Sequence, residues 1–412
     1  MKKITFSLLL TLLGTLVFGQ TTVNDFQKFA SVQDSLCIQA YEKRDDKKYD
    51  KLLKEFITKY DKLTDSDKKT FSNQLKNLYY NFCCLYSLQN NKVQALNYLE
   101  KCVKLNYNDY KHTTEDTDLD NIRNEDRYKK LIMSVRSIGD YNYILKKAEK
   151  YNTADNREFP KFTYQSADNP NLVALRKYFK LDSIAGTGNE VSRILNLLHW
   201  IHNLVPHDGH HENPIIKNAM DMIAICKKDK RGLNCRGLAT VLNECYLSLG
   251  IKSRFLTCMP KDSLQIDQDC HVINMVYSES LKKWLWIDPT NDAYVMNESG
   301  DLLSVEEVRE RLINNKPLII NPDANWNRKE SVVKEYYLNY YMAKNLYKFT
   351  CTVNSEYDIE TGSLGKKIVY IDLLPLDYYK QSPDKDEQIS KKTGAIFITY
   401  KTTNSALFWQ TP

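Results

Sequence analysis

Apolar positions from residue 24 to about residue 150 recur with the spacing of amphipathic helices. Leu and Tyr alternate there with Lys and Asp, while Gly and Pro are nearly absent. Ser66 is the predicted N-cap of a long helix that continues to Leu88. The pattern therefore predicts an α-helical region over residues 20–150.

The pattern changes after a polar connection at residues 151–188, which contains prolines and glycines and marks a domain boundary. Apolar stripes then predict helices, and alternating apolar residues predict strands. The helices are expected at 189–207, 218–227, 235–249 and 304–314, and the strands at 252–258, 271–277, 283–288, 349–353, 367–373 and 395–401. Helices that precede a sheet are typical of the α+β class. We expect a core domain over residues 189–329 and a C-terminal β-rich extension over residues 330–412.

Residues 80–107 of the helical region carry a more specific pattern. Two apolar segments flank the turn Asn90-Asn91, and Cys83, Ala95 and Cys102 fall where the two helices would touch. This stretch resembles one tetratricopeptide repeat, and residues 118–131 resemble the tail that often follows such repeats. The region is expected to bind a protein partner or to brace the next domain.

Composition places the chain among globular proteins and narrows its partners. Hydrophobic residues make up 42% and charged residues 27% of the 412 positions, a length that predicts two or three units. The formal net charge is +6, and both signs are interspersed. The sequence contains no dense Lys/Arg block with interleaved aromatic residues, so nucleic-acid binding is not expected.

The N-terminus has the pattern of a secretory signal peptide. Lys2 and Lys3 precede an almost wholly apolar run at residues 4–16, and Val17 and Gly19 suit a cleavage site before Gln20. A membrane anchor is the alternative, but the apolar run is short for a bilayer span. We expect residues 1–19 to be removed. The mature protein is then expected to be exported, either periplasmic or extracellular, with no membrane span after cleavage.

Ten cysteines in an exported chain raise the question of disulfides. Their spacing is irregular and the chain is long, so the pattern is not that of a small disulfide scaffold. Buried free thiols and one or two bridges both remain open.

One cysteine lies in a distinctive local context. Cys235 falls in the first turn of a predicted helix whose apolar stripe continues to Leu249. The positive end of a helix and its free N–H groups stabilise a thiolate, and the same N–H groups can face a developing oxyanion. Gly232 is expected to let the backbone turn sharply into this helix.

A base and its orienting carboxylate are predicted on the hairpin that follows. His271 begins one strand, the chain turns at residues 278–282, and the return strand ends at Asp288. Antiparallel pairing about this turn brings Asp288 close to His271 or Ile273 on a shared face. A carboxylate beside an imidazole fixes its tautomer and stabilises the imidazolium.

These residues together resemble the transglutaminase-like superfamily. The resemblance rests on Cys235 at a helix start, the segment Gly-Ile-Lys-Ser-Arg at 250–254, His271 on a strand, and Trp-Ile-Asp-Pro-Thr at 286–290. It implies a papain-like core with Cys235 as nucleophile, His271 as general base and acid, and Asp288 as orienting carboxylate. The chain departs from the family pattern at Leu233, where Gly is frequent, and after His271, where Ala-Trp is frequent.

Further side chains are candidates for the cleft. Arg236 could bind substrate or lower the pKa of Cys235, and Trp284 and Trp286 are expected to place one face of their strand in the cleft. The dense polar cluster at residues 207–212 lacks a regular frame for metal ligands, so we interpret it as a surface turn or the rim of the cleft. No metal and no cofactor are predicted.

The sequence thus predicts an exported cysteine hydrolase that cleaves a peptide or isopeptide bond through a thioester, with a protein or peptide as substrate. The alternative is a non-catalytic binding module in which the same core, with the helical region, recognises an exported protein or a cell-envelope polymer.

Overall fold

The structure is a computed structural model that describes residues 10–153, 157–262, 264, 269–377 and 385–412. The chain divides into two compact units, Met1–Asp140 and Tyr141–Pro412. The first is helical and the second combines helices with a mixed sheet, which confirms the predicted α+β class and the helical N-terminal region. Residues 1–9 of the predicted signal peptide lie outside the described residues. Among the described residues, no helix combines the length and the apolar character that a membrane span requires.

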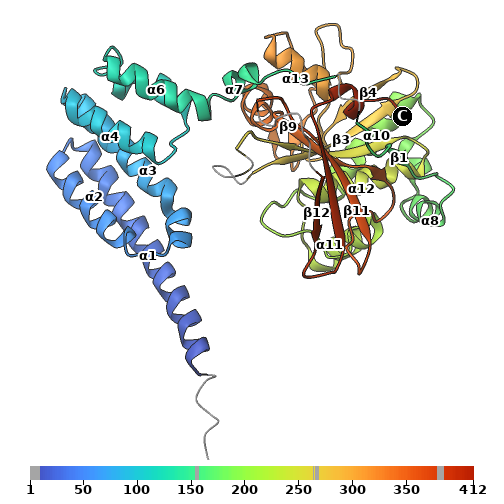
Figure 1. The fold of residues 1–412 in the computed structure, drawn as a ribbon, viewed down its shortest axis with the longest axis horizontal. Coiled ribbons are helices and arrows are strands. Elements are labelled where there is room, and N and C mark those ends of the chain that lie inside the picture. Colours follow the sequence, from blue (N-terminus) through green and yellow to red (C-terminus); the bar gives the residue numbers. More distant parts are fainter. Residues whose placement is uncertain (1–9, 154–156, 263, 265–268, 378–384) are drawn as a thin grey trace, which may run out of the picture. The chain divides into compact units, whose positions relative to one another are not determined.

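The N-terminal unit is a series of helices (Figure 1). Its core is rich in aromatic side chains. Its helices are α1 (Leu10–Glu42), α2 (Asp46–Tyr60), α3 (Asp65–Leu88), α4 (Lys92–Lys104), α5 (Tyr110–Glu115) and α6 (Asp126–Gly139), with a short 3-10 turn at Thr117–Leu119. The predicted cap at Ser66 was wrong, because the side chain of Thr64 accepts a hydrogen bond from the Asp67 amide and begins α3 earlier. Helices α3 and α4 form the predicted hairpin, with Asn90 at a φ of 59° in the turn.

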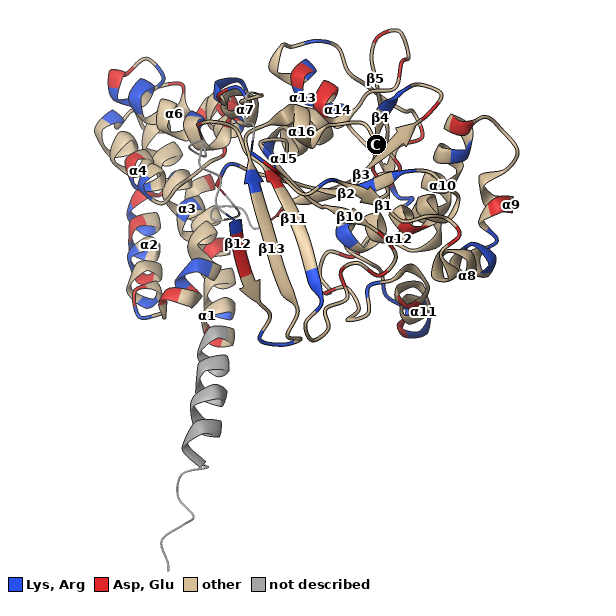
Figure 2. Cartoon of the chain, turned by 45° about the vertical axis from the view of Figure 1, so that its right-hand side comes forward, with Lys and Arg blue, Asp and Glu red and all other residues tan. Residues whose placement is uncertain are grey.

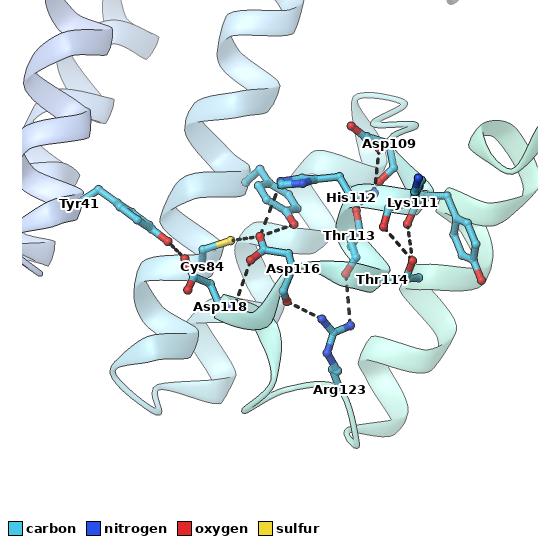
Figure 3. A network of polar contacts seen from close by, with 12 residues as sticks. Tyr41, Cys84, Asp109, Lys111, His112, Thr113, Thr114, Asp116, Asp118 and Arg123 are labelled. Carbon is cyan, nitrogen blue, oxygen red and sulfur yellow. Dashed lines mark hydrogen bonds and ion pairs between the residues drawn. The ribbon is translucent and has the colours of Figure 1, made fainter. Parts of the chain in front are cut away.

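A polar network fastens the segment after α5 to helix α3 (Figure 3). The Asp116 carboxylate accepts hydrogen bonds from the Tyr80 hydroxyl at 2.8 Å and from the Cys84 thiol at 3.5 Å. Arg123 donates to the backbone oxygens of Asp116 and Thr113. These bonds satisfy polar groups at the edge of an apolar core.

The second unit is built on a seven-stranded sheet in the order β12-β13-β11-β9-β2-β3-β4. Strands β11 and β13 are parallel, and the other neighbours in the sheet are antiparallel. The strands are β2 (Ser253–Met259), β3 (His271–Ser278), β4 (Lys283–Ile287), β9 (Lys348–Thr352), β11 (Lys367–Leu373), β12 (Lys385–Ile389) and β13 (Ile396–Thr402). Because β9 pairs with β2, residues of the predicted C-terminal extension complete the same sheet as the predicted core.

Helices cover both faces of this sheet. Helices α10 (Glu190–Leu204), α11 (Ala219–Asp229) and α12 (Cys235–Ser248) pack on the face that presents Val276 and Ile287. Helix α13 (Val305–Ile313), a π-helical turn at Tyr337–Met342 and α16 (Ser405–Phe408) cover the face that presents Met275 and Trp286. The smaller elements are α7 (Tyr141–Lys147), β1 (Thr163–Tyr164), α8 (Pro170–Phe179), α9 (Leu181–Ala185), β5 (Val295–Met296), β6 (Ile319–Ile320), β7 (Asn325–Trp326), β8 (Glu330–Ser331), α14 (Lys334–Tyr336), α15 (Ala343–Asn345) and β10 (Asn354–Ser355).

Charged side chains are mixed in sign over the surface. Figure 2 shows basic and acidic segments next to each other along the helices of the N-terminal unit. In the part of the chain that the structure describes, we see no large block of one sign in this view. This distribution agrees with the interspersed charges of the sequence.

Candidate active site

Cys235 is the first residue of helix α12, as its sequence context predicts. The helix is capped by Asn234, whose side-chain oxygen accepts a hydrogen bond from the Gly237 amide at 3.2 Å. Asn213 holds this cap from outside: its side chain binds both the backbone N–H and the side-chain oxygen of Asn234, at 3.1 Å and 2.6 Å. Cys235 therefore lies at the positive end of α12, next to amides that have no acceptor within the helix.

His271 and Asp288 form a buried pair at the adjacent end of the sheet. His271 is the first residue of β3, and Asp288 directly follows β4. The His271 Nε2 atom lies 2.7 Å from Asp288 Oδ2, and both side chains are buried. The β3–β4 register ends at the pair Asn274–Ile287, which brings Asp288 to the same end of the hairpin as His271.

The Asp288 carboxylate is held by several further donors. Its Oδ2 atom also accepts from the Tyr337 hydroxyl at 2.6 Å and from the Asn291 side-chain amide at 2.9 Å. Its Oδ1 atom accepts from the Thr290 backbone N–H at 2.9 Å. A carboxylate with this many donors is fixed in position and stabilised in its ionised form.

The electrostatics of the three groups favour an ion pair. Burial alone would raise the pKa of Cys235, but hydrogen bonds with the His207 and His271 side chains, the charge of His271 and the Val272 N–H together lower that pKa to about 6. Burial opposes the imidazolium of His271, yet the charge and hydrogen bond of Asp288 raise its pKa to about 10. Burial also opposes ionisation of Asp288, but His271 lowers its pKa to about 2. The directions of these shifts favour a thiolate beside an imidazolium.

Cys235 and His271 open onto a pocket of about 980 Å³. Arg236 lines the same pocket, and its Nη1 atom lies 3.4 Å from the Glu360 carboxylate and 3.3 Å from the Thr257 hydroxyl. The loop at residues 207–213 contributes His207, Gly209, Glu212 and Asn213 to this pocket, which is the position that the interpretation as a cleft rim predicts. Aromatic side chains complete the wall at Trp326, Tyr336, Tyr337 and Tyr341.

Two predicted cleft residues lie elsewhere. Trp284 is 4% exposed and Trp286 is fully buried, and both belong to the hydrophobic core beneath the sheet. Neither lines the pocket that contains Cys235. The prediction that Trp284 and Trp286 line the cleft was therefore wrong. Helix α13 and the C-terminal segment cover the face of the sheet on which both indoles lie.

The remaining cysteines differ from Cys235. None of the ten, all of which are described, forms a disulfide. Burial raises the pKa of Cys270, which lines the same pocket, to about 11, and burial likewise raises the pKa of Cys258. Within the described residues, no group of three or more His, Cys, Asp or Glu side chains is arranged to hold a metal ion. Cys235 thus stands apart as a thiol with a lowered pKa.

Sequence reasoning missed several residues that complete the site. Tyr337, Tyr341 and Asn291 approach Asp288 and His271, and Tyr337 and Tyr341 lie in a π-helical turn that no hydrophobic period predicts. Asn291 was within reach of inference, because an Asn three residues after a candidate Asp can bind that carboxylate in a local turn. His207 belongs to the polar cluster at residues 207–212, for which the sequence predicts a surface turn or the rim of the cleft and no catalytic role.

Comparisons with known proteins add little to this geometry. No family model matches the chain, and no curated protein matches it. A solved structure that does match is a proposed cysteine protease from Cytophaga hutchinsonii, at 20% sequence identity and a TM-score of 0.22. The match covers 35% of this chain and 46% of that chain, so it spans less than half of the matched protein. We therefore base the functional assignment on the geometry of the site alone.

Gly232 offers a test of how the site is assembled. Gly232 does not have a positive φ, so it is not needed for a sharp turn. An added Cβ would instead lie 2.3 Å from the Pro206 backbone oxygen and 2.7 Å from the Asp208 Cβ. Gly232→Ala should separate the two segments, lower the unfolding free energy by about 1–3 kcal/mol and slow alkylation of Cys235.

All five tryptophans lie in the second unit, so urea denaturation followed by tryptophan fluorescence reports on that unit. Gly209→Ala is the matched control, because its Cβ would meet only the His207 ring at an ordinary 3.5 Å. Equal stability of the two variants would contradict the steric explanation.

Proposed function

We propose that this protein is a transglutaminase-like cysteine hydrolase that cleaves an amide bond through a thioester on Cys235. The observation that carries the proposal is a pocket-lining thiol with a lowered pKa beside a buried His271–Asp288 pair. Buried ion pairs are costly to fold, and strongly perturbed pKa values in a cleft are a mark of catalytic sites. A papain-like arrangement of a helix start and a sheet end supports the same assignment.

The residues can carry out acyl transfer in two steps. The Cys235 thiolate attacks the carbonyl carbon, a C–S bond forms, and the carbonyl π electrons move to the oxygen. When the tetrahedral intermediate collapses, the C–N bond breaks and His271 gives its proton to the leaving amine. A water molecule then attacks the thioester, His271 takes its proton, and the acid leaves as Cys235 returns to the thiolate. Asp288 holds His271 in the required orientation throughout.

The lining of the pocket suits a protein or peptide substrate. Aromatic side chains at Trp326 and Tyr336 and charged side chains at Glu212 and Lys217 all line this pocket. Apolar walls with a few polar groups are the usual composition of a ligand site. We also propose, on the pattern of residues 1–19, that the protein is exported, and that its helical unit contacts a protein partner.

Selective alkylation of Cys235 tests the proposal. Iodoacetamide should label Cys235 in the wild type with a rate that rises as pH increases through about 6, because the thiolate is the reacting form. His271→Ala removes the cation and one of the hydrogen bonds that lower the Cys235 pKa, so that pKa should rise toward its ordinary value of 9.0 and labelling at pH 7 should fall by up to roughly 100-fold. Peptide mass spectrometry after timed labelling measures both rates.

Cys270 is an internal control, since it lines the same pocket and should react far more slowly at pH 7. Slow and equal labelling of Cys235 and Cys270 would overturn the hydrolase proposal and favour a binding module with an inactive core. A rate for Cys235 that does not change in His271→Ala would contradict the ion pair.

A further inference from the structure

A second imidazole reaches the proposed nucleophile. The His207 side chain lines the same pocket as Cys235 and His271, and it is one of the groups that lower the pKa of the Cys235 thiol. Its Nδ1 atom is buried and has no hydrogen-bond partner among the described residues. A buried polar atom without a partner is costly, and where it persists beside a reactive group it calls for a functional explanation.

The backbone of His207 is held from two sides. On one side it forms a parallel bridge with Leu233: Leu233 donates to the Pro206 oxygen at 3.1 Å, and Asp208 donates to the Leu233 oxygen at 2.8 Å. On the other side the Asn327 side chain accepts from the His207 N–H at 2.6 Å and donates to its oxygen at 3.0 Å. The His207 ring is therefore presented to Cys235 by a fixed main chain, although it lies between regular elements.

Asn327 lies in the turn of the β7–β8 hairpin, and this hairpin also contacts the His207 ring. Trp326 lies edge-on to the His207 imidazole, with ring centroids 6.3 Å apart. The hairpin is itself fastened to helix α10, because Asn325 Oδ1 lies 2.9 Å from His202 Nε2 and Arg328 donates to the Asn203 oxygen at 2.9 Å. A donor that must act on a transient charge is most effective when its position is set before the reaction.

In the proposed reaction His271 transfers the proton to the leaving amine and takes it from water. His207 is therefore available for a different role. When Cys235 attacks a carbonyl carbon, negative charge leaves the sulfur and develops on the carbonyl oxygen. A donor beside the sulfur can then bond the carbonyl oxygen, because that oxygen is attached to the carbon that has just bonded the sulfur.

We propose that His207 donates a hydrogen bond from its ring to this oxyanion, together with the first amides of helix α12. The inference rests on the proposed acyl-transfer function and adds a catalytic residue to it. His207 keeps its proton throughout: the electron pair moves to the oxygen on attack and returns to the carbonyl when the C–N bond breaks, while His271 transfers the proton to the leaving group.

Two reactions of Cys235 separate this role from simple activation of the thiol. Alkylation by iodoacetamide needs the thiolate but forms no oxyanion, whereas acylation by p-nitrophenyl acetate passes through one. Both rates are measured at the pH plateau of each variant, so that a change in the Cys235 pKa does not contribute. In His207→Ala, the burst of p-nitrophenol should slow about 10²- to 10³-fold, while alkylation changes less than about threefold.

A side chain of similar length that can donate a hydrogen bond should restore part of the acylation rate lost in His207→Ala. His207→Gln is expected to recover at least about tenfold of the acylation rate lost in His207→Ala, because its amide can donate one hydrogen bond. His210→Ala is the matched control: it removes an exposed imidazole from the same loop and should leave both rates unchanged. Melting temperatures of all variants check that the second unit is folded.

The outcomes of these experiments test the oxyanion role of His207 separately from the acyl-transfer activity of Cys235. A folded His207→Ala variant that acylates at the wild-type rate would overturn the role of His207 and leave the hydrolase proposal intact. A parallel loss of alkylation and acylation at their plateaus would assign His207 to holding Cys235 in place, which also overturns the oxyanion role. A wild type that alkylates quickly but releases no p-nitrophenol above the uncatalysed rate would contradict acyl transfer itself.

Discussion

Asp288→Asn should abolish most of the acyl-transfer activity while leaving the second unit folded. The substitution keeps the size of the side chain but removes the charge that raises the pKa of His271. An asparagine amide can also donate to His271 Nε2, which forces the proton onto Nδ1 and leaves no acceptor for a proton on the side of Cys235. We expect the p-nitrophenyl acetate burst to slow by roughly 10³- to 10⁴-fold, the scale that a wrong tautomer produces in serine enzymes.

The pH dependence of iodoacetamide labelling is a second, independent test of Asp288→Asn. Without the charge of Asp288, the His271 imidazolium loses its main support, so the midpoint for iodoacetamide labelling should move upward from about 6. Tyr337→Phe is the matched control, because it removes one donor to Asp288 Oδ2 and keeps the carboxylate. It should slow acylation by about tenfold or less. An Asp288→Asn variant within tenfold of wild type would contradict the orienting role of the carboxylate.

Local signals along the chain were enough to predict most of the fold. Asparagines preceding apolar stripes mark the starts of α10, α11 and α12, and each of them caps its helix in the structure. The strand that begins at His271 and the strand that ends just before Asp288 were predictable because a short polar turn separates two apolar alternations. Strand β12 was missed, because its five residues are exposed and carry no apolar alternation.

The site was predictable only where its parts lie on regular elements. Cys235 at a helix start and His271 at a strand start follow from periodicity and capping, and their order along the chain supplied the resemblance. Tyr337 and His207 could not be placed in this way, because each reaches the site through an irregular segment. The closeness of the Pro206 and Gly232 backbones depends on tertiary packing, which no local pattern encodes.

The two tryptophans of β4 lie on a regular element, yet their environment could not be predicted from the sequence. Alternation correctly predicted that Trp284 and Trp286 share a face, but it could not say which layer would cover that face. In the structure both faces of the sheet are covered, so a strand rich in apolar residues has no face left for a cleft. The pocket forms instead beyond the strand ends, where helix α12 begins and the hairpin of His271 and Asp288 ends.

Glu244→Ala should destabilise the second unit more than any other single removal of a polar side chain that we propose. Glu244 is 1% exposed on helix α12, and its two oxygens accept from the Ala219 amide at 2.8 Å and the Asp358 amide at 2.9 Å. The substitution leaves both amides without this partner and opens a cavity, so the unfolding free energy should fall by about 2–5 kcal/mol. Urea denaturation followed by tryptophan fluorescence measures the loss.

The pH dependence of the unfolding free energy separates the contribution of the Glu244 hydrogen bonds from that of its charge. Burial raises the pKa of Glu244 from 4.5 to about 8, so the folded protein binds a proton that the unfolded chain releases between these values. Wild-type stability should therefore decrease from pH 5 to pH 8 relative to Glu244→Gln, which cannot ionise. Glu279→Ala, an exposed glutamate that pairs with surface lysines, should leave the denaturation midpoint unchanged. If Glu244→Gln and the wild type keep a constant difference across this range, Glu244 does not titrate in the folded protein. Its role would then be confined to joining the start of α11 and the segment before Glu360 to the helix that carries Cys235.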